Sequence, residues 1–274
     1  MTATTAPTTS RTRVRSSGAG WRGFGRLLRT EATVWLRDST SVFFGILFPT
    51  VLLVGVGFGI PGMREPMTDD VPPDSIWYGV TPIATYLPTV LAMAIGTLAI
   101  LSLPVTFATF RDKGVLRRLS TTPMRPQAIV VAHLLINVAT TLVGVALALT
   151  VAQLAFGIVR PTQLGVVLGA FVLGMLALFS LGMLLAAVVS KPSTANAIGS
   201  LVYFPLLFLA GLWTPGPIMP DVVRQIGQFT PMGAAAQAMD TGWFGDGFPM
   251  LQFVVMAAWT VVLLPLAVRL FRWT

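Results

Sequence analysis

The chain has 274 residues, of which 54% are hydrophobic and only 10% are charged, with a formal net charge of +8 and a mean hydropathy of +0.79. This composition excludes an ordinary soluble domain, in which about a quarter of the residues carry a charge. The absence of cysteine excludes disulfides and thiolate metal sites.

The first two segments differ from the rest of the chain in composition. Residues 1–20 are rich in Thr, Ser, Ala and Arg without an apolar run, which predicts a disordered cytoplasmic tail. In residues 21–38, apolar side chains alternate with arginines at helical spacing, which predicts an amphipathic helix lying in the membrane interface. A solvated basic leader is the alternative. We assign 39–274 to a transmembrane domain.

Six long intervals of that domain lack Asp, Glu, Lys and Arg. The shortest, 247–268, holds 22 residues, and as a helix at about 1.5 Å per residue it would cross a hydrocarbon core of about 30 Å. Backbone amides in hydrocarbon have no water to bond, so each span should be helical. We predict six transmembrane helices, over approximately 41–61, 83–109, 129–158, 164–189, 195–214 and 248–268.

The distribution of Lys and Arg orients these spans. With the N-terminus inside, fifteen of the 18 basic residues fall on inner segments, and only Arg64, Arg160 and Arg224 fall outside. Cytoplasmic loops retain such residues. We therefore expect a multi-pass protein of the cell membrane with both termini in the cytoplasm. Anionic lipid head groups account for the positive charge, so no nucleic-acid partner is predicted.

The inner loop between the second and third spans is a basic segment, 110–126, which we call the cassette. Val115, Leu116 and Leu119 recur at helical spacing, and Pro123 and Pro126 would stop the helix. From the residues alone, this pattern is also compatible with a simple topology determinant.

The cassette sequence RDKGVLRRL, followed by TTPMRP, resembles the cytoplasmic loop of ABC-2 type transporter permeases. The run KPSTANAIGSLVYFPLLFLAGLWTPGPIMP and the following QIGQFTPMGAAAQAM resemble the fifth span and outer segment of the same family. Arg29, Glu31 and the pair Arg37-Asp38 resemble its leading amphipathic helix. After Pro231, however, Met232 and Gly233 stand where an aromatic residue would be expected, which puts the contacts of the outer helices in doubt.

The resemblance implies an all-α membrane protein with a cytoplasmic coupling helix and short outer re-entrant helices. It also implies a homodimeric export permease driven by a separate ABC ATP-binding subunit. The chain has no G-x-x-x-x-G-K-[ST] motif, so no cofactor is expected in it, and ATP and Mg would bind the partner subunit. The residues implied to couple to that subunit are Arg111, Asp112, Gly114, Val115, Leu116, Arg117, Arg118 and Leu119.

A few polar residues within the spans are candidates for lining a translocation pathway, because such residues are costly in lipid. They are His133, Asn137, Thr140, Thr141, Asn196 and Tyr203. Hydrogen bonding between packed helices is the alternative role. His133 has no second histidine and no carboxylate within a span to form a metal site with it.

The sequence therefore favours a permease, not an enzyme, that exports an amphipathic or apolar compound such as a drug, antibiotic or lipid-like metabolite. We expect efflux of that compound, with antibiotic resistance as its biological result. Export of a polysaccharide or glycolipid is the alternative within the family. An ion-coupled secondary transporter is disfavoured because no carboxylate lies within a predicted span.

Overall fold

The computed structural model describes residues 23–68, 71–115, 127–158 and 160–271. These residues contain helices and no strands, and six helical stretches are long and apolar enough to cross a membrane: Ser39–Gly59, Pro82–Asp112, Gln127–Phe156, Leu164–Val188, Pro192–Leu209 and Met250–Leu270. The predicted all-α fold with six spans is confirmed. The largest difference is in the fifth span, whose helix ends at Leu209, several residues before the predicted limit.

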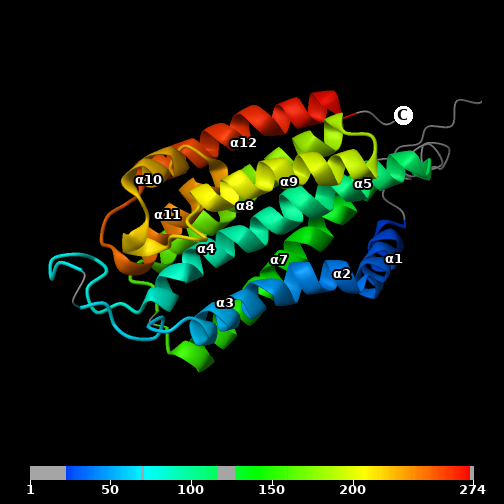
Figure 1. Ribbon diagram of the computed structural model, residues 1–274. Helices are drawn as coiled ribbons and strands as arrows, with labels where there is room; N and C mark the ends of the chain where they lie inside the picture. The colour runs from blue at the N-terminus through cyan, green and yellow to red at the C-terminus, as the bar shows by residue number, and fades with distance from the viewer. Residues whose placement is uncertain (1–22, 69–70, 116–126, 159, 272–274) are drawn as a thin grey trace, which may run out of the picture.

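The first two spans are each built from more than one helical segment. The first joins α2 (Ser39–Val42), η2 (Phe43–Leu47) and α3 (Phe48–Gly59), and the second joins α4 (Pro82–Gly96), η3 (Thr97–Ser102) and α5 (Leu103–Asp112). The remaining spans are α7 (Gln127–Phe156), α8 (Leu164–Val188), α9 (Pro192–Leu209) and α12 (Met250–Leu270). The second span is the most deeply buried of the six and runs through the centre of the bundle (Figure 1).

Proline explains the interruptions in the first two spans. Both η2 and η3 are π-helical turns, and they immediately precede Pro49 and Pro104. A proline has no N–H and its ring clashes with the carbonyl four residues earlier, so the preceding turn widens. The carbonyls concerned are those of Gly45 and Ile100.

Neighbouring helices approach these two carbonyls through glycine. A Cβ added to Gly144 of α7 would lie 2.6 Å from Gly45 O, and one added to Gly199 of α9 would lie 2.8 Å from Ile100 O. Only a residue without a side chain allows such close backbone contact, in the way that small residues permit helix packing in membranes. The widened turns are therefore points of close backbone contact, of the first span with α7 and of the second span with α9.

The termini of the described chain lie at one end of the bundle. Helix α1 (Phe24–Arg37) lies at the same end as the last residues of α5 and the end of α12 (Figure 1), and we call this the α1 end. Helix α1 directs Phe24, Leu27, Leu28 and Trp35 inward, whereas Val34 is 60% exposed.

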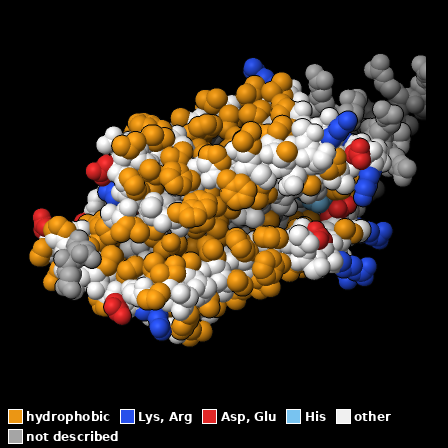
Figure 2. Space-filling model, viewed as in Figure 1, with side chains coloured by type: hydrophobic (Ala, Val, Ile, Leu, Met, Phe, Trp, Pro, Cys, Tyr) orange, Lys and Arg blue, Asp and Glu red, His pale blue; other side chains and the backbone are white. Residues whose placement is uncertain are grey.

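The opposite end, which we call the α10 end, carries a 60–81 loop and three short elements. These are η4 (Gly216–Ile218), α10 (Asp221–Gly227) and α11 (Pro231–Phe244). Helix α11 packs against α8, α4 and α12, so it is part of the bundle core. Apolar side chains cover the visible face between the two ends, and the charged side chains gather at the ends (Figure 2).

Candidate functional site

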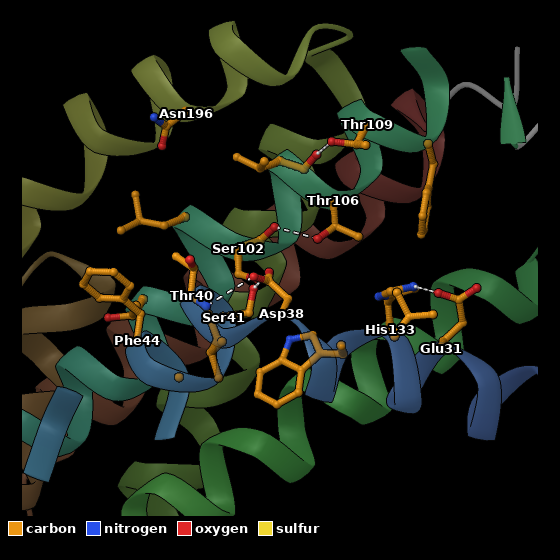
Figure 3. A pocket seen from close by; sticks show the side chains of 18 of the residues that line it. Glu31, Asp38, Thr40, Ser41, Phe44, Ser102, Thr106, Thr109, His133 and Asn196 are labelled. Atoms are coloured by element: carbon orange, nitrogen blue, oxygen red, sulfur yellow. Dashed lines mark hydrogen bonds and ion pairs between the residues drawn. The ribbon is translucent and has the colours of Figure 1, made fainter. Parts of the chain in front are cut away.

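A cavity of about 700 Å³ opens near the α1 end. Its walls come from α1, the start of the first span, the second span and α9, which contributes Asn196. The lining combines aromatic side chains with hydroxyl groups, and the polar residues point into the same space (Figure 3). The lining includes Trp35, Phe44, Phe110, Thr40, Ser41, Ser102, Thr106, Thr109, His133 and Asn196.

One wall of the cavity is closed by an interaction between α1 and α7. Glu31 Oε2 lies 3.1 Å from His133 Nε2, and the rings of Phe107 and Phe110 form edge-to-face contacts with the imidazole. No carboxylate lies within a predicted span, and Glu31 reaches His133 from α1, outside every span. The described residues contain no group of three or more His, Asp or Glu that could hold a metal ion.

The other predicted pathway residues of α7 lie in a packed seam. Asn137 Nδ2 donates to His133 O at 2.8 Å, and Thr141 Oγ1 donates to Asn137 O at 2.9 Å, both within the helix. Asn137 and Thr141 are almost fully buried, and Thr140 contacts the first span beside Gly45. None of the three lines the cavity. His133 lines the cavity, whereas these three residues are buried in the packing around α7.

Tyr203 lies behind the cavity wall. Its hydroxyl is 2.8 Å from Thr97 Oγ1, and Thr97 also donates to Met93 O at 2.8 Å. Thr97 faces the cavity but Tyr203 does not. Of the six predicted pathway residues, only His133 and Asn196 line the space directly.

Hydroxyl groups of the second span were missed by the sequence analysis. Ser102, Thr106 and Thr109 follow each other at spacings of four and three residues and line the cavity together. Thr106 Oγ1 donates to Ser102 O at 3.0 Å, and Thr109 Oγ1 donates to Val105 O at 2.8 Å. Their helical spacing could have indicated this polar face. A Ser or Thr hydroxyl in a helix donates to a carbonyl of the preceding turn, and its oxygen can still accept a hydrogen bond from a group beside the helix.

The cassette begins at this end of the bundle. Helix α5 ends at Asp112, and Gly114 with a φ of 65° turns the chain, as glycine does after many helices. Asp112 is exposed and Val115 is half-buried. Four of the predicted coupling residues, Leu116, Arg117, Arg118 and Leu119, lie outside the described residues.

Arg111 has its side chain engaged within the bundle. Its Nη1 donates to Val189 O at 2.8 Å and to Ala186 O, and the guanidinium lies 4.9 Å from the centre of the Phe271 ring. These carbonyls close the last turn of α8, where a cationic side chain is favourable. Arg111 therefore ties the end of α5 to the ends of α8 and α12.

A second, polar cavity of about 220 Å³ lies at the α10 end, bounded by α4, α11, α12 and the 210–224 segment. Asp240 of α11 lines it, and Asp240 Oδ1 is buried without a hydrogen-bond partner among the described residues. Burial raises the pKa of this carboxyl well above its usual range, and the charge of Arg224 opposes the shift. Arg224 Nη2 itself donates to Gly216 O at 3.2 Å.

A comparison with protein families decides the class of the protein. The family model for ABC-2 type transporters matches residues 20–244. The chain belongs to the ABC-2 type transporter family. This ABC-2 permease is thus a membrane transport subunit, of a family whose members normally pair with an ABC ATP-binding subunit. No curated protein matches the chain.

The family match places the large cavity and the start of the cassette within the shared region. It ends at Phe244, so α12 lies beyond it. The structure nevertheless packs α12 along α8 and against α11, which makes the last span of this ABC-2 permease an integral part of its bundle.

Proposed function

We propose that this permease exports an amphipathic or apolar compound, such as a drug, an antibiotic or a lipid-like metabolite, from the cytoplasm or the inner leaflet. The observation that carries the proposal is the cavity at the α1 end. Trp35, Phe44 and Phe110 offer apolar surface there, while Ser102, Thr106 and Asn196 offer hydrogen bonds. A site that orients a ligand has this composition of apolar walls and a few polar groups.

The direction of export rests on the orientation of the bundle. The basic residues of α1 and of the segment around Lys113 lie at the α1 end, and the positive-inside rule puts that end in the cytoplasm. Both termini would then be cytoplasmic, in the cell membrane. The cavity would receive its compound from the inner side.

The energy would come from a separate ABC ATP-binding subunit, with ATP and Mg bound there. The cassette would dock on that subunit through Val115, Leu116 and Leu119, with Arg117 and Arg118 attracting it electrostatically. Closure of the ATP-binding subunits would reach the spans as a rigid-body shift. Two copies of the permease would form the pathway as a homodimer, with efflux and antibiotic resistance as the biological outcome.

Co-purification tests the coupling assignment. The paired change Leu116→Asp and Leu119→Asp should abolish retention of the tagged ATP-binding partner and leave membrane insertion intact. Changing Lys191, an exposed residue between α8 and α9 that is not among the predicted coupling residues, to Gln is the control and should retain the partner. Undiminished retention by the double variant would refute the docking site.

Transport into sealed vesicles tests the activity itself. Vesicles containing the permease and its partner should accumulate a fluorescent amphipathic dye in the presence of ATP and Mg, and not with a non-hydrolysable ATP analogue. Uptake driven by a proton or sodium gradient without ATP would replace the proposal with secondary transport.

A further inference from the structure

An apolar groove, separate from the two cavities described above, lies on the side of the bundle between α7 and α8. These helices follow each other in the chain and both pack on α4, but in the described residues they make little direct contact with each other. A groove of about 330 Å³ remains between them. Leu87 and Leu91 of α4 form its floor together with Ala152, and all three are at most 2% exposed.

The edges of the groove face outward over its length. Leu142 of α7 is 49% exposed and Leu168 of α8 is 55% exposed, so both would meet lipid tails in a membrane. A groove lined by such residues in hydrocarbon fills with an acyl chain, because an unfilled space loses the dispersion contacts of its lining.

The polar residues of the groove are confined to the end nearest α10. Gln153 and Arg160 line this end, both are exposed, and neither side chain forms a hydrogen bond or ion pair with another described residue. Arg160 follows the end of α7 by four residues, so it lies where the span leaves the hydrocarbon. An arginine at this depth reaches the phosphate of a lipid head group.

We propose that the α7–α8 groove is a binding site for one phospholipid molecule, with an acyl chain between the helices and the phosphate on Arg160 and Gln153. The positive charge of Arg160 at one end of the groove matches the phosphate of the lipid, and the apolar walls match its acyl chain. A second copy of the chain would instead have to present an anionic group to Arg160 and an apolar ridge to the groove. Among the described residues of α7 and α8 there is no carboxylate that could do so.

Native mass spectrometry of the delipidated full-length protein tests the site, with added phosphatidylglycerol as the probe. We expect one retained lipid per chain in the unchanged protein. Arg160→Gln should reduce its occupancy about fivefold, which corresponds to the loss of one arginine–phosphate attraction. Arg64→Gln, which changes an arginine that stacks on Phe58 and does not line the groove, should have no effect.

Ala152→Phe fills the floor of the groove and should abolish retention, whereas Ala146→Phe, on an exposed position of the same helix, should not. Diacylglycerol, which lacks the phosphate, should bind the unchanged protein and Arg160→Gln equally.

Full retention by both Arg160→Gln and Ala152→Phe would overturn the site. Conversion of a dimer to a monomer by Ala152→Phe would also overturn it, in favour of an interface between two copies. Because Arg160 is exposed, its variant decides the question even if Ala152→Phe does not fold.

Discussion

Glu31 of α1 and His133 of α7 lie 102 positions apart in the chain, yet their side chains are 3.1 Å apart at the wall of the large cavity. The two groups lie within ion-pair distance. Their contact joins α1 to the third span, and both residues line the cavity that we propose to receive the exported compound.

A double-mutant cycle with Glu31→Ala and His133→Ala should give a coupling energy of about 1 kcal/mol, because contacting residues in one polar interaction are not additive. Thermal unfolding of the purified protein in detergent measures it. Glu65→Ala combined with His133→Ala is the control, since Glu65 belongs to the loop at the opposite end. Additive effects of Glu31→Ala and His133→Ala would mean that the contact contributes nothing to stability.

Single cysteines should distinguish the cavity from the α7 seam, and the chain supplies a cysteine-free background. Asn196→Cys should react with a membrane-impermeant thiol reagent applied from the α1 side, because Asn196 lines the cavity. Asn137→Cys should not react, because Asn137 is 1% exposed. Fast labelling at 137, with or without nucleotide, would show that this residue lines an aqueous pathway.

Tyr203→Phe should lower stability by about 1 kcal/mol, because it removes the buried hydrogen bond between the Tyr203 hydroxyl and Thr97, which keeps its bond to Met93 O. Tyr78→Phe is the matched control, since Tyr78 is 46% exposed. The readout is the shift in melting temperature. Equal shifts for the two variants would contradict a contribution from the Tyr203 hydrogen bond.

Gly144→Ala should reduce the yield of folded protein strongly, because the added Cβ would meet the Gly45 carbonyl at 2.6 Å and backbone atoms cannot easily give way. Gly165→Ala, at a helical glycine with open space around it, should be neutral or stabilising by up to about 1 kcal/mol through helix propensity. Size-exclusion profiles in detergent compare the two. A normal profile for Gly144→Ala would show that α7 and the first span do not pack as described.

Asp240 should make the protein less stable as pH rises. Its folded-state pKa is raised by burial, so the folded protein holds this proton more tightly than the unfolded chain does. Stability is therefore greatest below the ordinary carboxyl pKa of about 3.9 and falls as pH rises from there through the raised value. Asp240→Asn should remove that part of the pH dependence of the melting temperature, whereas Asp221→Asn should leave it in place. Parallel curves for wild type and Asp240→Asn would contradict the burial effect.

Charge-free intervals of more than twenty residues determine the six spans, so the sequence was sufficient to predict them. The hydrogen-bonding roles of Asn137 and Thr141 could not be derived in the same way, since helical spacing places a residue on a face but does not say whether that face meets a cavity or another helix. Glu31 was missed for a related reason. It lies outside every span, and only the fold of α1 against α7 brings it to His133.

Arg111 gives the end of the second span a mechanical role. Its guanidinium joins the last turn of α5 to the carbonyls of α8 and the ring of Phe271. A pull on the segment that follows α5 would therefore act on three helices at once, α5, α8 and α12.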